Sequence, residues 1–98
     1  MKLTKSMIYK ESAEAQELYL YAVNDSAIYN MSIPVINNII KHIERNRYNA
    51  EKAIIAFYHI ATEAAKKYNK DFGGSFTVTE RWTAAQDMRD RYIEDYTA

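Results

Sequence analysis

The sequence has no cysteine, a single proline and only two glycines among its 98 residues. Without cysteine the chain has no disulfide, no thiolate nucleophile and no cysteine ligand for a metal. Because turns and sheet edges consume glycine and proline, their shortage favours helices joined by short links. The longest apolar runs, residues 18–23 and 53–58, fall far short of the roughly 20 residues that a membrane-spanning helix needs. Residues 1–5 lead into no hydrophobic stretch, so we expect no signal peptide.

The sequence also has no excess of positive or negative charge, because 13 lysines and arginines balance 13 aspartates and glutamates. A net charge of zero removes the strongest general argument for a nucleic-acid or membrane binder. The hydrophobic content of 48% is that of a globular protein. A chain of this length has room for one core, so we predict a single soluble domain over residues 1–98. The lack of disulfides is typical of a reducing cytoplasm.

What the sequence does contain is helical periodicity. Apolar residues recur at the helical spacing along four segments, residues 4–23, 33–46, 50–70 and 78–96. Asn49 is suited to cap the start of the third segment, and Gly73 and Gly74 can adopt the left-handed conformation that ends it. Thr77 and Glu80 predict a capping box at the start of the fourth.

Two further expectations concern the second and fourth helices. Pro34 fits the first turn of the second helix, where the amides lack intrahelical partners, and residues 24–31 form either a loop or a short helical turn. On the fourth helix Thr83 and Asp87 belong to a polar stripe that we expect to face solvent, together with Glu80, Asp90 and Glu94. Four amphipathic helices, or five with a short one at 24–31, bury their apolar stripes against one another, which predicts an all-α bundle.

No arrangement of residues suggests catalysis. His42 and His59 are the only histidines, and neither has a serine one helical turn away. His59 and Glu63 share a helix face, but a metal site needs three or four ligands. We therefore predict a protein that is not an enzyme, with no metal and no cofactor.

Nine tyrosines are the most unusual feature, since tyrosine is favoured at protein interfaces. Several large side chains depart from the apolar stripes and are candidate protein-binding residues: Leu20, Tyr21, Tyr48, Ile55 and Tyr58. Either the helix that carries Ile55 is buried on all sides, or these residues meet a partner. An exposed apolar surface of this kind would also be covered in a homodimer.

A basic junction, Lys41, Arg45, Arg47 and Lys52, surrounds the link between the second and third helices. Such a cluster is one way to contact nucleic-acid phosphates. The alternative is ordinary solvated helix ends, because cations are favoured near a helix C-terminus. Nucleic acid is therefore the second choice of partner, after protein.

Three segments of the second half, residues 48–53, 64–72 and 76–81, resemble short helical proteins encoded by bacteriophages and other mobile elements of bacteria. The resemblance implies an accessory factor that binds and masks a protein in the cytoplasm of a bacterial host cell, such as an inhibitor of a defence system. It implies no site residue.

Overall fold

Four α-helices and a terminal π-helical turn make up the part of the chain that the structure describes, residues 12–95 of a computed structural model. The elements are α2 (Ala13–Asn24), α3 (Ser26–Glu44), α4 (Ala50–Phe72), α5 (Val78–Arg89) and the π-helix η1 (Asp90–Glu94). The predicted all-α bundle is confirmed. Among these helices none combines the length and the apolar character needed to cross a membrane.

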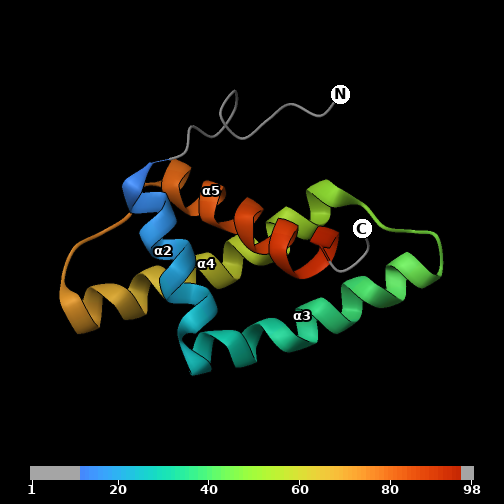
Figure 1. Cartoon of the computed structure of the whole chain (residues 1–98), viewed down its shortest axis with the longest axis horizontal. Helices are drawn as coiled ribbons and strands as arrows, with labels where there is room; N and C mark the ends of the chain where they lie inside the picture. Colours follow the sequence, from blue (N-terminus) through green and yellow to red (C-terminus); the bar gives the residue numbers. More distant parts are fainter. Residues whose placement is uncertain (1–11, 96–98) are drawn as a thin grey trace.

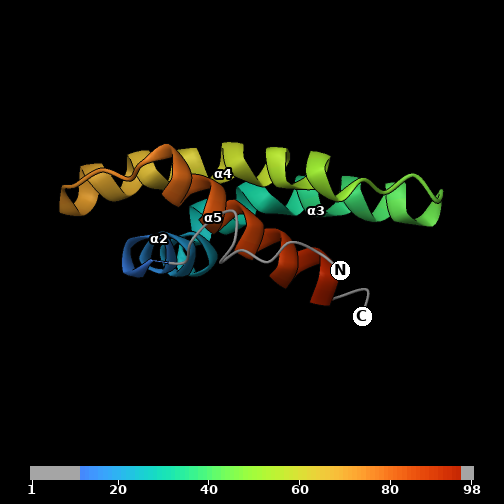
Figure 2. The ribbon, with the colours of Figure 1, turned by 90° about the horizontal axis from the view of Figure 1, so that it is seen from above.

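The helices form two layers. α3 and α4 lie side by side and antiparallel, joined by the link at residues 45–49, while α2 and α5 pack on one face of this pair (Figures 1 and 2). α2 runs across α4, and α5 contacts both α2 and α4. α4 therefore touches every other α-helix described, and its two ends point toward opposite sides of the molecule.

Local capping explains where most helices begin and end. The Asn49 side chain accepts a hydrogen bond from the Lys52 amide at 3.0 Å, and Thr77 and Glu80 form the predicted capping box. Gly73 and Gly74 have φ values of 79° and 104°, the left-handed backbone that ends α4. Residues 4–11 of the predicted first helix lie outside the described residues, and α2 begins after an Ser12 cap.

The second helix begins earlier than the sequence predicted. Asp25 caps α3, its carboxylate accepting a hydrogen bond from the Ile28 amide at 3.1 Å. The segment at 24–31 is thus neither a loop nor a separate turn, and Pro34 lies inside α3 rather than in its first turn. Proline has no amide hydrogen, so position 34 cannot donate the usual helical hydrogen bond to the Asn30 carbonyl.

The core contains few large side chains. Phe57, Leu18, Met88 and Ile93 are fully buried. Six buried alanines on α4 and α5 occupy much of the remainder: Ala53, Ala61, Ala64, Ala65, Ala84 and Ala85. Small side chains let helix backbones approach closely. The buried residues of α4 recur at the helical spacing and confirm its predicted apolar stripe.

The predicted solvent stripe of α5 is wrong. Thr83 and Asp87 are buried, as are Gln86 and Arg89, so α5 is enclosed along residues 83–89. The reason is that α5 packs against α2 as well as α4, so the face opposite α4 is covered too. Thr83 compensates for its burial by donating a hydrogen bond to the Thr79 carbonyl at 3.0 Å.

Candidate interaction surfaces

An aromatic patch, formed by Tyr21, Tyr68, Phe72 and Phe76, lies where α2 crosses the last turns of α4. The rings of Tyr68 and Phe72 are 5.0 Å apart, and that of Tyr21 is 5.3 Å from Tyr68. Phe76, in the link after α4, lies 5.1 Å from Tyr68 in an edge-to-face arrangement. Tyr21 also meets Phe72 edge-on at 6.1 Å. Tyr68 thus stands at the centre of four contiguous rings.

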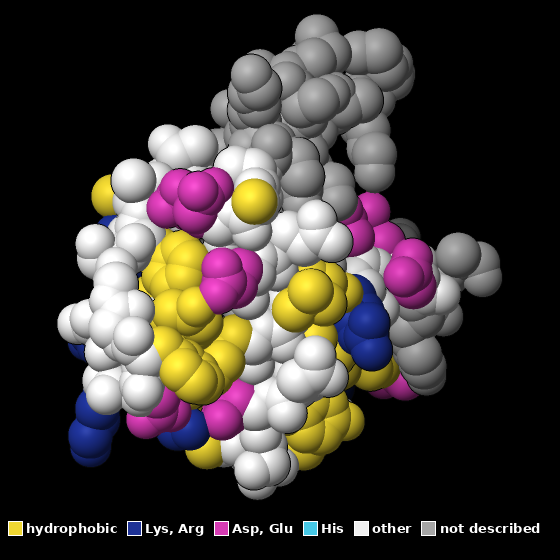
Figure 3. Space-filling view, turned by 60° about the vertical axis from the view of Figure 1, so that its left-hand side comes forward, with side chains coloured by type: hydrophobic (Ala, Val, Ile, Leu, Met, Phe, Trp, Pro, Cys, Tyr) yellow, Lys and Arg dark blue, Asp and Glu magenta, His cyan; other side chains and the backbone are white. Residues whose placement is uncertain are grey.

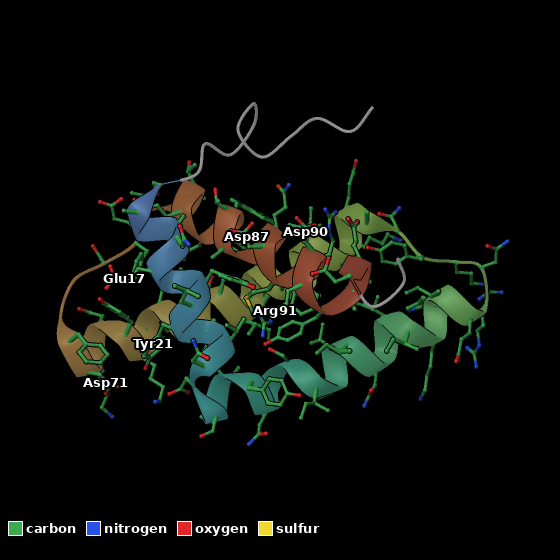
Figure 4. The ribbon with its side chains drawn as sticks, in the orientation of Figure 1. Glu17, Tyr21, Asp71, Asp87, Asp90 and Arg91 are labelled. Atoms are coloured by element: carbon green, nitrogen blue, oxygen red, sulfur yellow. The ribbon has the colours of Figure 1, made fainter. Side chains whose placement is uncertain are left out.

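Both tyrosine hydroxyls of the patch donate hydrogen bonds to carboxylates. The Tyr21 hydroxyl donates to Asp71 Oδ2 at 3.1 Å, and the Tyr68 hydroxyl donates to Glu17. Desolvation, followed by the hydrogen bond to Asp71, raises the pKa of Tyr21, and the hydrogen bond to Glu17 raises the pKa of Tyr68. Glu17, Tyr21 and Asp71 share one end of the molecule (Figure 4). Both rings are therefore fixed in place by carboxylates, and Lys67 adds a cation 5.8 Å from the centroid of the Tyr21 ring.

Phe72 is the outermost member of the aromatic patch. Its side chain is 69% exposed, the largest exposed fraction among the exposed large hydrophobic residues. Figure 3 looks at this side of the molecule, where hydrophobic side chains gather with acidic side chains around them. An exposed phenylalanine backed by two ordered tyrosines is suited to insertion into an apolar pocket of a partner.

Two of the predicted protein-binding residues are exposed but far apart. Leu20, next to Tyr21 in the sequence, is 45% exposed, and Ile55 is 48% exposed. The Tyr21 hydroxyl of α2 bonds to Lys67 and Asp71 of α4. Ile55 precedes Lys67 by roughly 18 Å along the axis at 1.5 Å per residue. The structure therefore brings Tyr21 to the aromatic end of α4 and leaves Ile55 elsewhere.

Tyr58 does not lie on open surface. Its ring stacks on Trp82 of α5 with centroids 4.0 Å apart, and Arg81 donates a hydrogen bond to its hydroxyl at 3.2 Å. Half-buried Tyr58 packs against the core, so it joins α4 to α5. Its departure from the apolar stripe of α4 reflects the position of α5.

The basic junction opens into a cleft of about 410 Å³ between α3 and α4. Asn38, Ile39 and His42 line it from α3, Lys52 lines it from α4, and Arg47 and Tyr48 line it from the link. The cleft thus includes two of the four predicted basic residues. Lys41 and Arg45 are exposed at the end of α3 but do not line it.

Tyr48 packs partly into the core behind this cleft. Its hydroxyl is buried and has no hydrogen-bond partner among residues 12–95. Burial raises its pKa, with Arg89 opposing the shift. Tyr48, a candidate protein-binding residue from the sequence, therefore forms a wall of the cleft.

Among the described residues, some cations have a side-chain partner within the chain, whereas Lys70 and the four cations of the basic junction have no ion pair. Away from the basic junction, Lys66, Lys67 and Arg89 form ion pairs within the chain, and Arg81 and Arg91 bond to tyrosine hydroxyls. Among the described residues, no carboxylate pairs with any of the four cations of the basic junction. Positive charge is thus available at one end of α4, opposite the aromatic patch.

Residues 12–95 contain no group of three potential metal ligands.

The sequence did not predict most of the aromatic patch, namely Tyr68, Phe72 and Phe76 with the carboxylates of Glu17 and Asp71. The one available signal was the four-residue spacing of Tyr68, Phe72 and Phe76 across the end of α4.

No family model, curated protein or solved structure matches the chain.

Proposed function

We propose that this is a non-enzymatic interaction protein that binds a protein partner through the aromatic patch. The observation that carries the proposal is Phe72, 69% exposed and supported by the ordered rings of Tyr21 and Tyr68. Rigid aromatic side chains lose little conformational entropy on binding, and they dominate the energetics of many interfaces.

The surroundings of the aromatic patch indicate the chemistry of the partner. Glu17 and Asp71 lie beside the rings, and both are exposed. A matching surface would present an apolar pocket for Phe72 with lysine or arginine around it. Charges at the rim of an interface mainly accelerate association, so we expect the association rate to fall as salt increases.

The biological role that we propose follows the resemblance to proteins of mobile elements. In that role the chain acts in the cytoplasm of a bacterial host cell and masks a surface of a host protein, for example a defence protein. Masking needs tight occupancy of a surface and no catalytic group, which suits a patch on a small rigid bundle.

Capture with matched variants tests the proposal. The immobilised protein, Phe72→Ser and Ile55→Ser would each be incubated with a bacterial lysate, and retained proteins would be identified by mass spectrometry. Both substitutions remove an exposed apolar side chain from α4. We expect a partner that is retained by the wild type and by Ile55→Ser but lost with Phe72→Ser. Equal retention by all three would contradict the role of the patch.

A second candidate function is nucleic-acid binding at the basic junction, favoured by four cations that form no ion pair within the described part of the chain. Neutralising phosphates releases counterions, so such binding must weaken steeply with salt. Gel shifts at low salt, with Lys41, Arg45, Arg47 and Lys52 together changed to glutamine as the comparison, test this function. No shift with the wild-type protein would remove it.

A further inference from the structure

The cleft between α3 and α4 has the size and lining of a small-ligand site. Its volume of about 410 Å³ falls within the roughly 300–1,000 Å³ of pockets that hold such ligands. We propose that it binds a small organic phosphate of nucleotide size, with the phosphate between Arg47 and Lys52.

The walls of the cleft differ in character from its rim. Ile39 and Ala53 are buried core residues, and with Ala56 they give the cleft an apolar interior. Arg47 and Lys52 are exposed where the cleft meets solvent. A ligand with an apolar or aromatic body and an anionic group matches this division, because each part meets its complementary surface.

Lys52 provides the strongest argument for a bound anion. It is the third residue of α4, in a turn where the helix dipole disfavours a cation. No carboxylate among the described residues pairs with it. Lys41 and Arg45 lie at the C-terminal end of α3, where a cation is favourable, so the fold accounts for them. The position of Lys52 is explained if an anion occupies the cleft.

Neighbouring groups suit phosphate in particular. Arg47 offers a planar guanidinium that can donate two hydrogen bonds to one phosphate. His42 and Asn38 add donors from the α3 side, and α4 directs the positive end of its dipole toward the same region. Two cations and these donors match a doubly charged group better than a single carboxylate.

This site is independent of the aromatic patch. The cleft lies at the start of α4 and the patch at its end. These two ends lie on opposite sides of the molecule (Figure 1), so either site can fail experimentally without the other. The phosphate can belong to a free nucleotide or to the 5′ end of a nucleic-acid strand, and the same recognition serves both.

Titration with AMP and with adenosine, followed by NMR of backbone amides, tests the proposal. We expect AMP to shift resonances of residues around the cleft, and adenosine to bind at least about tenfold more weakly, because a charge-assisted contact is lost. Absence of AMP-induced shifts at millimolar ligand, or equal binding of adenosine, would overturn the proposal.

Four single variants of equal charge change locate the phosphate. Arg47→Met and Lys52→Met remove cations inside the cleft, while Lys41→Met and Arg45→Met remove cations just outside it. We expect about tenfold weaker AMP binding for the first two and less than about twofold for the others. In the absence of ligand, Lys52→Met should raise the urea midpoint of unfolding, because it removes an unfavourable charge from the first turn. If all four variants weakened AMP binding equally, the phosphate would be attracted by the overall positive potential of the basic junction and not held between Arg47 and Lys52, which would contradict the proposal.

Oligonucleotides separate the two sources of phosphate. A strand with a 5′ phosphate that binds more tightly than AMP, and that loses affinity when the phosphate is removed, assigns the cleft to strand ends. If AMP binds as tightly as the phosphorylated strand, the cleft recognises free nucleotides. If strands bind equally with and without the 5′ phosphate, and AMP does not bind, the proposed phosphate site in the cleft is overturned. The basic junction would then bind polyanions in general.

Discussion

The carboxylate of Asp25 accepts a hydrogen bond from Lys67 Nζ at 2.8 Å. Its second oxygen accepts from the Ile28 amide at 3.1 Å and caps α3. Lys67 also lies 3.6 Å from Asp71, whose carboxylate holds the Tyr21 hydroxyl of the aromatic patch. The turn between α2 and α3 is thereby bonded to α4 and, through it, to the candidate binding surface.

Asp25→Ala should lower the free energy of unfolding by about 1–2 kcal/mol, because it removes both the cap and the ion pair. Asp25→Ser keeps a capping oxygen and loses only the charge, so we expect a loss of about 0.5 kcal/mol. Urea denaturation measures both. Equal losses for the two variants would contradict a capping role.

The same aspartate makes stability depend on pH. The hydrogen bond from Lys67, followed by that from the Ile28 amide, holds the pKa of Asp25 below its ordinary value. Its contribution is therefore fully present above the unfolded-state pKa of about 3.9 and is lost as pH falls through the lower folded-state pKa. Asn remains a good cap. The difference in unfolding free energy between wild type and Asp25→Asn should then shrink below about pH 4.

Tyr58→Ala should cost about 2–3 kcal/mol of stability, because it removes a half-buried ring stacked on Trp82. Tyr58→Phe keeps the ring and loses only the hydrogen bond from Arg81, so we expect a loss of at most about 1 kcal/mol. Thermal unfolding distinguishes the two. If Tyr58→Ala left the stability unchanged, the stacking of Tyr58 on Trp82 would be contradicted.

Ile55→Glu tests the homodimer that the sequence predicts. Because Ile55 is 48% exposed, we expect the substitution to keep the fold and to change the unfolding free energy by no more than about 0.5 kcal/mol. If copies associate through this face, light scattering should give the mass of a dimer for wild type and of a monomer for Ile55→Glu. A wild-type protein with the mass of one chain at high concentration would exclude the dimer.

Arg89 and Arg91 should respond differently to the same change. The Arg89 side chain is 7% exposed and bonds to Asp90, to Glu94 in η1 and to the Ala50 carbonyl. Arg89→Met removes a buried cation together with its bonds to these three groups, so we expect a loss of about 2 kcal/mol. Exposed Arg91→Met should cost no more than about 0.5 kcal/mol. Urea denaturation measures both variants, and a loss for Arg89→Met as small as that expected for Arg91→Met would contradict a stabilising role of the Arg89 contacts.

Helix boundaries were the part of the structure most accessible from the sequence. Asn49, Thr77, Glu80 and Gly73 act within a few residues of themselves, so their roles follow from local chemistry. The apolar stripe of α4 is equally local, since a periodic pattern needs only its own helix to be recognised. The start of α3 was missed because a cap at Asp25 overrode the preference of Pro34 for a first turn.

The candidate surfaces depended more on tertiary structure. Tyr21 reaches Asp71 across 50 residues of sequence, and no local pattern records such a contact. The exposure of α5 was misjudged and that of Tyr58 was left open, because a helical pattern shows which residues share a face but not how many faces other helices cover. By itself the sequence determined an all-α bundle, most of its helix boundaries and the clustering of basic residues around one link. Packing decided which polar residues are enclosed, which aromatic rings gather beside Phe72, and which two of the four cations line a cleft, because burial is a property of several helices together.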